Sequence, residues 1–353
     1  MIKYNNKIMK KKLRIIFFIV ILFIGGLYLL FRMQPKKENG EEIEKTEIIL
    51  PPEISLEAKK LDIKTASFLN WLNNNDVVYY NGRQIFSLDI NTLNSKSLLT
   101  LDFELKSLAV KNNLITIQEG LPFTQIKNYY VYRNNESKQL DLSDYEPVVS
   151  IFPSPFSNKV NFIGNFDVNK KGGNLYSYEI DSGKVDGPLL NNVPYSSIQW
   201  IDNNKALMYK FLDEQGGETL FLIDTQKKSS KTISSDIKAL TSAEISPDKT
   251  RLLISGENNL IVKELENISQ TKKLKSQSFY GFWVDSQNIL LTPAKTSIEF
   301  LILNIDAKTE RIIETPSLLV SKTLRTLIPS PTNEYALLRT EDNSWYLIKV
   351  TKK

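Results

Sequence analysis

The sequence of 353 residues contains no cysteine and no histidine. Without cysteine, the chain can form no disulfide, no zinc–thiolate site and no cysteine nucleophile. Without histidine, it can build no Ser-His-Asp triad, no imidazole proton shuttle and no histidine metal ligand. Carboxylate chemistry and oxygen-ligated calcium or magnesium are the main options that remain. No motif selects one of them, so we predict no cofactor and no metal site.

Acidic residues are missing from one part of the chain. Residues 1–37 contain nine Lys or Arg residues and no Asp or Glu. The rest holds 36 basic and 40 acidic residues, so the formal charge of +5 belongs to the N-terminal segment and the remainder carries −4. A mildly acidic body has no general field that attracts phosphates. We therefore predict that the protein has no nucleic-acid partner.

One long apolar run lies near the N-terminus, from Leu13 to Phe31, and Arg14 is its only charge. Helical residues rise about 1.5 Å each, so this run spans roughly 30 Å, which matches the hydrocarbon thickness of a bilayer. We predict a short basic tail at 1–12, a transmembrane signal-anchor helix at 13–32 and a solvated linker at 33–46.

The flanks of this run indicate its orientation. Basic residues crowd its N-terminal side at 10–12, whereas the C-terminal side turns acidic after residue 37. The positive-inside rule then places the N-terminus in the cytoplasm and the folded body outside, with the protein in the cell membrane by a single pass. The rival interpretations are a cleaved signal peptide and a buried core helix. The run is long for a signal peptide, and residues 31–35 offer no small-x-small cleavage site, which favours an uncleaved anchor.

Beyond the linker, the chain consists of short runs rich in β-branched and aromatic residues, separated by Asn, Asp, Gly and Ser-Pro turns, which is typical of an all-β protein. Two turn sequences recur. One follows Trp71, Trp200 and Trp283, and the other is a Ser-Pro turn at 154–155, 246–247 and 330–331. Seven units begin near the residues Thr65, Leu105, Pro147, Pro194, Leu240, Gln277 and Lys322, mostly 37 to 47 residues apart. A period near 40 with about four strands per unit predicts a seven-bladed β-propeller, with six or eight blades as alternatives.

These repeats resemble the TolB-type and WD-repeat-like propeller family. The resemblance covers roughly residues 65–350 and rests on the Ser-Pro-Asp turn at 246–248, the following Leu252-Leu-Ile and hairpins that end in Leu-Phe-x-Ile-Asp. The unit at 105–142 departs from the pattern because it has neither turn sequence, and no Gly-His…Trp-Asp signature occurs. Members of the family mostly bind proteins or peptides, so the resemblance implies a binding module.

The repeat pattern also predicts how the ring is closed. The last unit offers three strands before the chain ends at Lys353, whereas residues 47–63 contain strand-like sequence without a unit of their own. An open edge strand is a liability that propellers avoid by closing the circle. We therefore expect a propeller over residues 47–353 in which a strand within 47–63 completes the last blade. The recurring tryptophans are interpreted as inter-blade packing residues.

Loop lengths suggest a binding face. The hairpin between the second and third strands is tight in the first unit, at 80–83, but long in the next three units, at 119–128, 166–174 and 212–219. Loops on a rigid scaffold often carry binding. We hypothesise that this raised sector forms a protein- or peptide-binding rim. Its members would be the apolar and aromatic residues Leu121, Phe123, Tyr129, Tyr130 and Tyr132.

The predicted function is therefore that of a membrane-anchored, extracytoplasmic propeller that binds or scaffolds an envelope protein or peptide, without enzymatic activity. The alternative is an extracytoplasmic carbohydrate-active enzyme that uses paired carboxylates. Such chemistry needs two carboxyl groups about 5 Å or roughly 6.5–9.5 Å apart. With 40 acidic residues in the chain, the sequence nominates no pair.

Overall fold

The computed structural model describes residues 50–353, except for 64–67, 121–126, 157, 195, 212–216, 239, 241, 258 and 295–296. The chain divides into two compact units, Met1–Ile48 and Ile49–Lys353, and the described residues belong to the second. The predicted tail, transmembrane helix and linker lie outside the described residues. Within the described part of the chain, no helix is long and apolar enough to cross a membrane.

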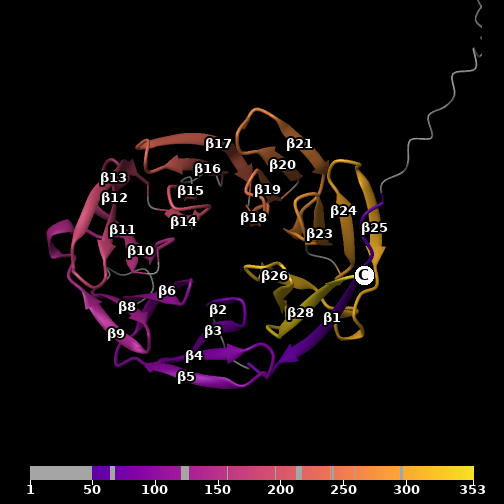
Figure 1. Cartoon of the computed structure of the whole chain (residues 1–353), viewed down its shortest axis with the longest axis horizontal. Coiled ribbons are helices and arrows are strands. Elements are labelled where there is room, and N and C mark those ends of the chain that lie inside the picture. The colour runs from indigo at the N-terminus through magenta and orange to yellow at the C-terminus, as the bar shows by residue number, and fades with distance from the viewer. Residues whose placement is uncertain are drawn as a thin grey trace, which may run out of the picture. The chain divides into compact units, whose positions relative to one another are not determined.

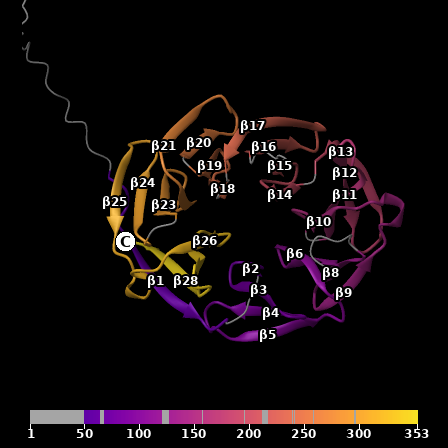
Figure 2. The ribbon, with the colours of Figure 1, turned by 180° about the vertical axis from the view of Figure 1, so that it is seen from behind.

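The second unit is a ring of seven four-stranded antiparallel sheets, as Figure 1 and, from behind, Figure 2 show. This confirms the prediction of an all-β, seven-bladed propeller. Regular helix among the described residues is limited to two 3₁₀ turns, η1 (Ser143–Tyr145) and η2 (Ser317–Leu319). Each sheet is one blade, and its four strands follow one another from the centre of the ring to its outside.

The strands are given from the first blade to the seventh. The innermost strands are β2 (Phe68–Trp71), β6 (Leu105–Lys111), β10 (Ser150–Pro153), β14 (Ser196–Trp200), β18 (Ser242–Ile245), β22 (Phe279–Trp283) and β26 (Leu324–Pro329). The second strands are β3 (Asp76–Asn81), β7 (Leu114–Glu119), β11 (Lys159–Asp167), β15 (Lys205–Phe211), β19 (Arg251–Gly256), β23 (Asn288–Pro293) and β27 (Tyr335–Thr340).

The third strands are β4 (Gln84–Asp89), β8 (Tyr129–Arg133), β12 (Gly172–Glu179), β16 (Gly217–Asp224), β20 (Asn259–Glu264), β24 (Phe300–Asn304) and β28 (Trp345–Lys352). The outermost strands are β5 (Ser95–Thr100), β9 (Glu136–Leu140), β13 (Val185–Val193), β17 (Ser229–Lys238), β21 (Thr271–Lys275), β25 (Thr309–Ile313) and β1 (Ile54–Leu61).

Burial falls from the second strand of a blade to its outermost strand. Five consecutive residues of β7 are buried, whereas most residues of β9, the outermost strand of the same blade, are exposed. A second strand has a neighbouring blade against each of its faces, so both sets of alternating side chains must be apolar. This explains why the second strands read as continuous apolar runs, while the outermost strands are rich in Ser, Lys and Glu.

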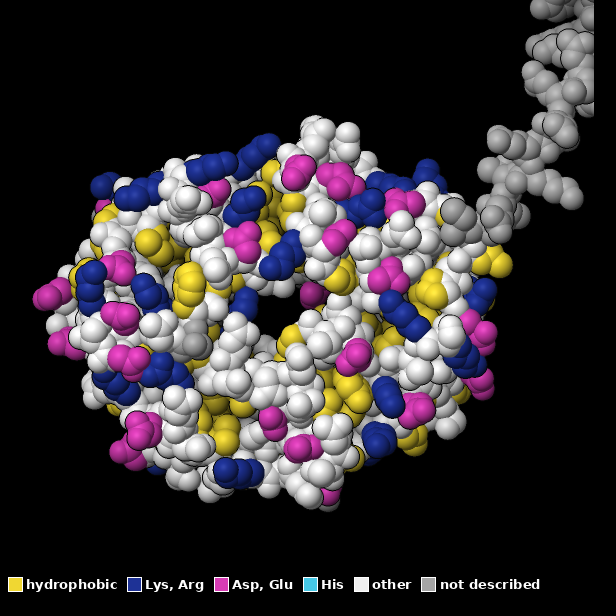
Figure 3. Space-filling model, viewed as in Figure 1, with side chains coloured by type: hydrophobic (Ala, Val, Ile, Leu, Met, Phe, Trp, Pro, Cys, Tyr) yellow, Lys and Arg dark blue, Asp and Glu magenta, His cyan; other side chains and the backbone are white. Residues whose placement is uncertain are grey.

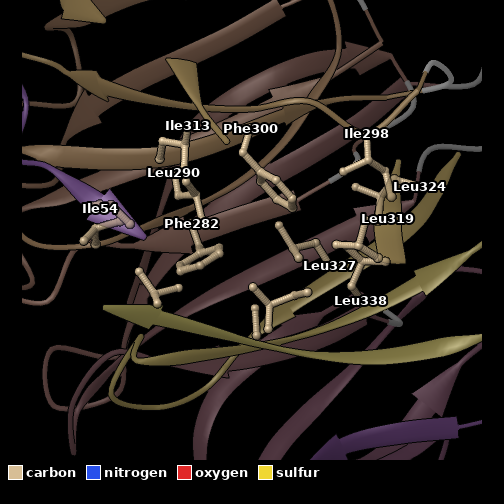
Figure 4. Packing of buried hydrophobic residues seen from close by; sticks show 14 of the residues in the cluster. Ile54, Phe282, Leu290, Ile298, Phe300, Ile313, Leu319, Leu324, Leu327 and Leu338 are labelled. Carbon is tan, nitrogen blue, oxygen red and sulfur yellow. The ribbon is translucent and has the colours of Figure 1, made fainter. Parts of the chain in front are cut away.

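The hydrophobic core is divided among the interfaces between blades. The buried side chains of the described residues form seven clusters, and each cluster joins residues of two adjacent blades. Between the sixth and seventh blades, Phe282, Leu290 and Phe300 pack against Leu327 and Leu338, as Figure 4 shows. A single four-stranded sheet cannot bury both of its faces, so the blades are stable only as a closed stack.

The ring is closed by strands from the two ends of the propeller sequence. Strand β1 pairs antiparallel with β28, with Ile54 opposite Lys352 and Leu61 opposite Trp345. The seventh blade therefore has the order β1-β28-β27-β26. Buried Ile54 belongs to the cluster between the sixth and seventh blades, and buried Leu61 to the cluster between the seventh and first. One strand thus contributes to two interfaces.

The two recurring turn sequences are two ways of connecting the innermost strand to the second strand. In the tryptophan type, an Asn or Asp two residues after the tryptophan accepts bonds from two backbone N–H groups; Asp202 Oδ1 accepts from the nitrogens of Asn204 and Lys205 at 2.7 and 2.8 Å. In the Ser-Pro type, the serine hydroxyl accepts instead, as Ser246 Oγ does from the Arg251 nitrogen at 2.9 Å. Both turns satisfy backbone donors that the ladder leaves unpaired.

The tryptophans pack between blades, as the sequence predicted. Each belongs to the cluster between its own blade and the preceding one. Trp71 Nε1 donates to the Ile328 oxygen at 3.1 Å, and Trp283 Nε1 donates to the Glu244 oxygen at 2.9 Å. Both acceptors lie two residues before the serine of a Ser-Pro turn. The two turn types are therefore complementary, because a tryptophan blade follows a Ser-Pro blade at each of these interfaces.

Candidate functional site

A recess of about 1430 Å³ lies at the centre of the ring. Figure 3 shows the open channel there, with side chains of both charges near its margin. The recess is lined by the innermost strands β2, β6, β10, β14, β18 and β26, and it extends to the turns that connect them to the second strands. Hairpins of the first, second, fifth and seventh blades border this end, which we call the turn mouth: residues 72–76, 112–113, 246–249 and 330–333.

The side chains around the recess are mixed in character. Asparagines are frequent in the hairpins of the first and second blades, at 73–75 and 112–113, and apolar groups such as Phe68, Phe152 and Ile198 lie deeper along the strands. Four charged residues contribute to the lining: Asp76, Lys111, Glu244 and Lys249. A concave surface with apolar walls and a few convergent polar groups is the usual form of a binding site.

Lys111 reaches across the turn mouth. It ends β6 of the second blade, and its Nζ donates to the backbone oxygen of Trp200 in the fourth blade at 3.1 Å. Burial and, to a smaller extent, the positive charge of Lys249 together lower the pKa of Lys111 to about 8. Among the described residues, no carboxylate lies within ion-pair distance of either lysine. The two ammonium groups therefore place two positive charges at this end of the recess without a described ion-pair partner.

Glu244 is the half-buried acid of β18. Burial raises its pKa to about 8, because desolvation disfavours the charged carboxylate. Its backbone oxygen accepts the Trp283 bond, but its carboxyl group has no hydrogen-bond or ion-pair partner among the described residues. The side chain is therefore largely neutral near pH 7 and presents both a donor and an acceptor to the recess.

Two further polar groups of the lining are buried without a partner within the described part of the chain. They are the indole nitrogen of Trp200 and the hydroxyl of Ser242. Trp200 differs in this from Trp71 and Trp283, although it occupies the equivalent position and packs against the preceding blade in the same way. Buried polar groups are usually hydrogen-bonded, so two unpaired groups beside one recess mark it as a place where a ligand can be held.

Both carboxylate oxygens of the other acid of the lining, Asp76, accept hydrogen bonds from residues of its own blade. Its carboxylate accepts from Asn73 Nδ2 at 3.0 Å and from Ser87 Oγ at 3.3 Å. Asp76 and Glu244 come from the first and fifth blades, so the described lining offers no close pair of carboxylates of the kind that glycoside hydrolysis requires. The described residues also contain no group of three or more acids that could hold a metal ion.

The predicted rim residues are distributed between the core and the undescribed segment. Leu121 and Phe123 lie outside the described residues. Tyr129 is buried between the second and third blades, and its hydroxyl donates to the Val148 oxygen at 3.0 Å. Tyr132 is buried between the first and second blades. The rim hypothesis therefore stays a prediction.

Tyr130 is the half-buried member of this set. Its ring stacks on Phe103 with centroids 4.8 Å apart, and its hydroxyl donates to Glu119 Oε2 at 3.2 Å. Asn128 Nδ2 donates to the same oxygen at 2.6 Å. These bonds fix the base of the hairpin that spans 119–128.

The hairpin of the third blade is shorter than the sequence suggests. Strand β11 continues to Asp167 and β12 begins at Gly172, so the connection is a tight turn and not a loop over 166–174. The register shifts between Gly164 and Asp167, and this bulge takes up the extra residues. Asp167 Oδ1 accepts from the backbone nitrogens of Asn169 and Lys170, which closes the turn.

The lengths of the loops do not point to the residues of the recess, but the repeats contain a signal for one of them. Glu244 lies two residues before the serine of its Ser-Pro turn, where the equivalent residues of the third and seventh blades are Phe152 and Ile328. An acid at an apolar repeat position is detectable by aligning the units. Lys111 has no such signal, because its contact with Trp200 joins blades that are not adjacent.

Comparisons with known proteins bear on the fold. No protein-family model matches the sequence, and no curated protein matches it significantly. Many solved structures are similar. The β-propeller domain of Cps50 (Swd1) from Myceliophteria thermophila has a TM-score of 0.53 at 11% identity, over 85% of this chain and 100% of that chain. YCF48 bound to a D1 peptide has a TM-score of 0.58 at 11% identity, over 87% and 98%.

Two further structures are a chain of the mitotic checkpoint complex and the WD40 domain of Neurospora crassa Pan2. Their TM-scores are 0.57 and 0.56, at 10% and 9% identity, and they cover 88% and 84% of this chain and 99% and 96% of those chains. The resemblance to WD-repeat-like propellers is therefore confirmed at the level of the fold. At these identities, the likeness concerns the fold alone.

Proposed function

We propose that this protein is a membrane-anchored, extracytoplasmic propeller that binds a protein or peptide of the cell envelope through its central recess. The observation that carries this proposal is the recess itself, which combines apolar walls with polar groups that lack partners in the described structure. Its volume of about 1430 Å³ exceeds the roughly 300–1,000 Å³ of ordinary small-molecule sites. An extended peptide or a protruding loop of a partner fits a recess of this size.

The likeness to other propellers supports a binding role. One similar structure is that of YCF48 bound to a D1 peptide, and another is a chain of the mitotic checkpoint complex. The lining supports it as well, because its charged groups do not form the close carboxylate pair that the alternative hydrolase would use. A rigid ring of seven blades presents the turn mouth as a fixed surface, which lowers the entropic cost of binding.

The anchor and the location are supported by the sequence. The apolar run from Leu13 to Phe31 has the length of a transmembrane helix, and the nine basic residues of 1–37 favour a cytoplasmic N-terminus. An anchored propeller would meet its partner at the membrane surface, where a modest affinity suffices because both molecules are confined.

Site-specific crosslinking in membranes tests the binding proposal. The chain has no cysteine, so a single cysteine can carry a benzophenone–maleimide in the full-length protein. Asn74→Cys and Thr332→Cys place the probe in the turn mouth, and Lys96→Cys places it on exposed β5 as a matched control. We expect specific adducts from the first two positions and none from the control. Adducts from Lys96→Cys alone would exclude the recess as the binding site.

The location can be tested separately with a membrane-impermeant maleimide. In the extracytoplasmic topology, Lys96→Cys is labelled in intact cells, whereas Asn5→Cys in the predicted tail is labelled only after permeabilisation. The reverse pattern would show that the propeller faces the cytoplasm.

A further inference from the structure

The turn mouth of the recess carries two positive charges without an ion-pair partner in the described residues. Lys111 extends from the second blade to the carbonyl of Trp200 in the fourth, so it passes the innermost strand of the third blade. Lys249 lies in the Ser-Pro hairpin of the fifth blade and lines the same recess. Two like charges that face one confined space favour the entry of an anion.

The geometry leaves donors available for such an anion. An ammonium group has three N–H donors, and the one bond of Lys111 to Trp200 leaves two of them free of any described partner. Trp200 supplies a further donor through its buried indole nitrogen, which has no partner in the described part of the chain.

The charged groups around the two lysines differ. The pKa of Asp202 is lowered by hydrogen bonds from the backbone nitrogens of Asn204 and Lys205 and also by the positive charge of Lys249. At Lys111, the charged group that acts on the pKa is Lys249, and no acid among the described residues contributes to it. Glu244 is largely neutral near pH 7. The positive charge of Lys111 therefore has no described counter-charge.

We infer that the recess binds an acidic peptide segment, with a carboxylate of the peptide held between Lys111 and Lys249. This inference rests on the proposed function and names the chemistry of its ligand. A carboxylate accepts the free N–H donors of the lysines, and the apolar walls contact the rest of the segment. The carboxylate comes either from an Asp or Glu side chain or from the C-terminus of the peptide.

Selection from displayed random peptides tests this assignment. The bait is the full-length protein in detergent micelles. One library presents the random segment at a free C-terminus, and the other presents it within a longer chain. We expect the selected peptides to be enriched several-fold in Asp and Glu when a side chain is bound. Binders from the free C-terminal library alone would identify the terminal carboxylate as the ligand group.

Substitutions of the two lysines test whether their positive charge or their side-chain shape selects acidic peptides. In Lys111→Met/Lys249→Met we expect the acidic enrichment to fall to the level of the unselected library. Lys111→Arg/Lys249→Arg should restore it, because both positive charges are kept. Lys96→Met on β5 removes a lysine far from the recess and should select the same peptides as the unaltered protein.

The outcomes distinguish this inference from the proposed function. Peptides that bind the recess without any acidic or C-terminal preference would overturn the inference and leave peptide binding intact. Acidic enrichment that persists in Lys111→Met/Lys249→Met would also overturn it. A failure of the unaltered protein to select any peptide would count against peptide binding itself.

Discussion

The interfaces at Trp71 and Trp283 differ from the interface at Trp200, although all three tryptophans follow the same sequence pattern. The first two donate their indole N–H to a carbonyl of the preceding blade, whereas that of Trp200 is buried without a partner among the described residues. At the interface of Trp200, the backbone oxygen of the tryptophan accepts a hydrogen bond from Lys111, which belongs to a strand two blades away. The same motif therefore joins blades through an indole hydrogen bond at two interfaces and leaves the indole nitrogen unpaired, among the described residues, at Trp200.

The position of a tryptophan in the repeat therefore determines how its ring packs between the blades. It does not determine whether the indole nitrogen has a hydrogen-bond partner. All three indole rings fill the same gap between blades, since that gap is set by the spacing of the sheets. The indole hydrogen bond to the preceding blade is present at Trp71 and Trp283, and Trp200 has none to a described residue. Sites that bind ligands often retain unsatisfied groups of this kind at some cost in stability.

The largest effect is expected when the strand that closes the ring is removed, because this strand contributes to the interface at Trp71. Deletion of residues 50–61 removes β1 and exposes the edge of β28. Burial of Ile54 and Leu61 is worth roughly 2 kcal/mol each, so we expect the free energy of unfolding to fall by about 4 kcal/mol or more. Chemical denaturation followed by circular dichroism measures it.

A control for this deletion changes β1 without removing its backbone. Glu57 and Lys59 are exposed, so Glu57→Ala/Lys59→Ala should change the stability by less than about 1 kcal/mol. An unchanged denaturation midpoint in the deletion variant would refute the closing role of β1.

The second test concerns the interface at Trp283, whose acceptor belongs to Glu244. The folded-state pKa of Glu244 is about 8, above the ordinary value of 4.5, so its contribution to stability is present at low pH and is lost as pH rises through 8. Glu244→Gln stays neutral and should exceed the unaltered protein by about 2–3 kcal/mol near pH 8.5, with little difference at pH 4. Urea denaturation at several pH values measures the difference in the free energy of unfolding between the two proteins. If Glu244 were fully solvated, this difference would not change with pH.

The third test compares the tryptophans directly. Trp71→Phe and Trp283→Phe each leave a carbonyl oxygen without its donor, and an unsatisfied buried group costs about 1–3 kcal/mol. Trp200→Phe removes no hydrogen bond from the indole nitrogen to a described residue, while its loss of ring volume is the same as in the other two variants. We therefore expect Trp200→Phe to be milder by about 1 kcal/mol in urea denaturation. Equal losses in all three variants would remove the distinction between the interfaces.

The smallest effect is expected at Lys111. Its folded-state pKa of about 8 lies below the ordinary value of 10.5, so the unfolded chain holds more protons between these values and stability rises with pH there. Because the site is only partly screened from water, we expect a gain of about 1 kcal/mol between pH 8 and 10.5. Lys111→Met should abolish that rise relative to Lys96→Met. The contrary result is a rise of the same size in both variants.

The sequence predicted much of the fold because the repeats encode it locally. The tryptophan and Ser-Pro turns each satisfy backbone donors within a few residues, so their spacing marks the inner end of a blade. The length of a hairpin was harder to predict. At 166–174 the strands absorb residues through a bulge, where Gly164 lies so close to the Tyr145 oxygen that a Cβ would come within 2.7 Å of it.

The candidate site was less accessible to sequence reasoning. Lys111 and Trp200 are 89 residues apart and belong to blades that do not touch along the ring, so no local pattern connects them. Glu244 is one acid among 40, and only its position in the aligned repeat sets it apart. The lining of a channel depends on which side chains the closed circle brings together, and that information is non-local.

The pairing of β1 with β28 also sets the order in which the molecule can be completed. Of the described strands, β1 is synthesised first and its partner β28 is synthesised last, roughly 290 residues later. At about 5–20 residues per second, the strand waits some 15–60 s for that partner. Its exposed Glu57, Lys59 and Lys60 carry charge during this interval, and charged edges resist pairing with other chains. The strand that closes the ring thus also carries charged side chains that disfavour its pairing with other chains before β28 has been synthesised.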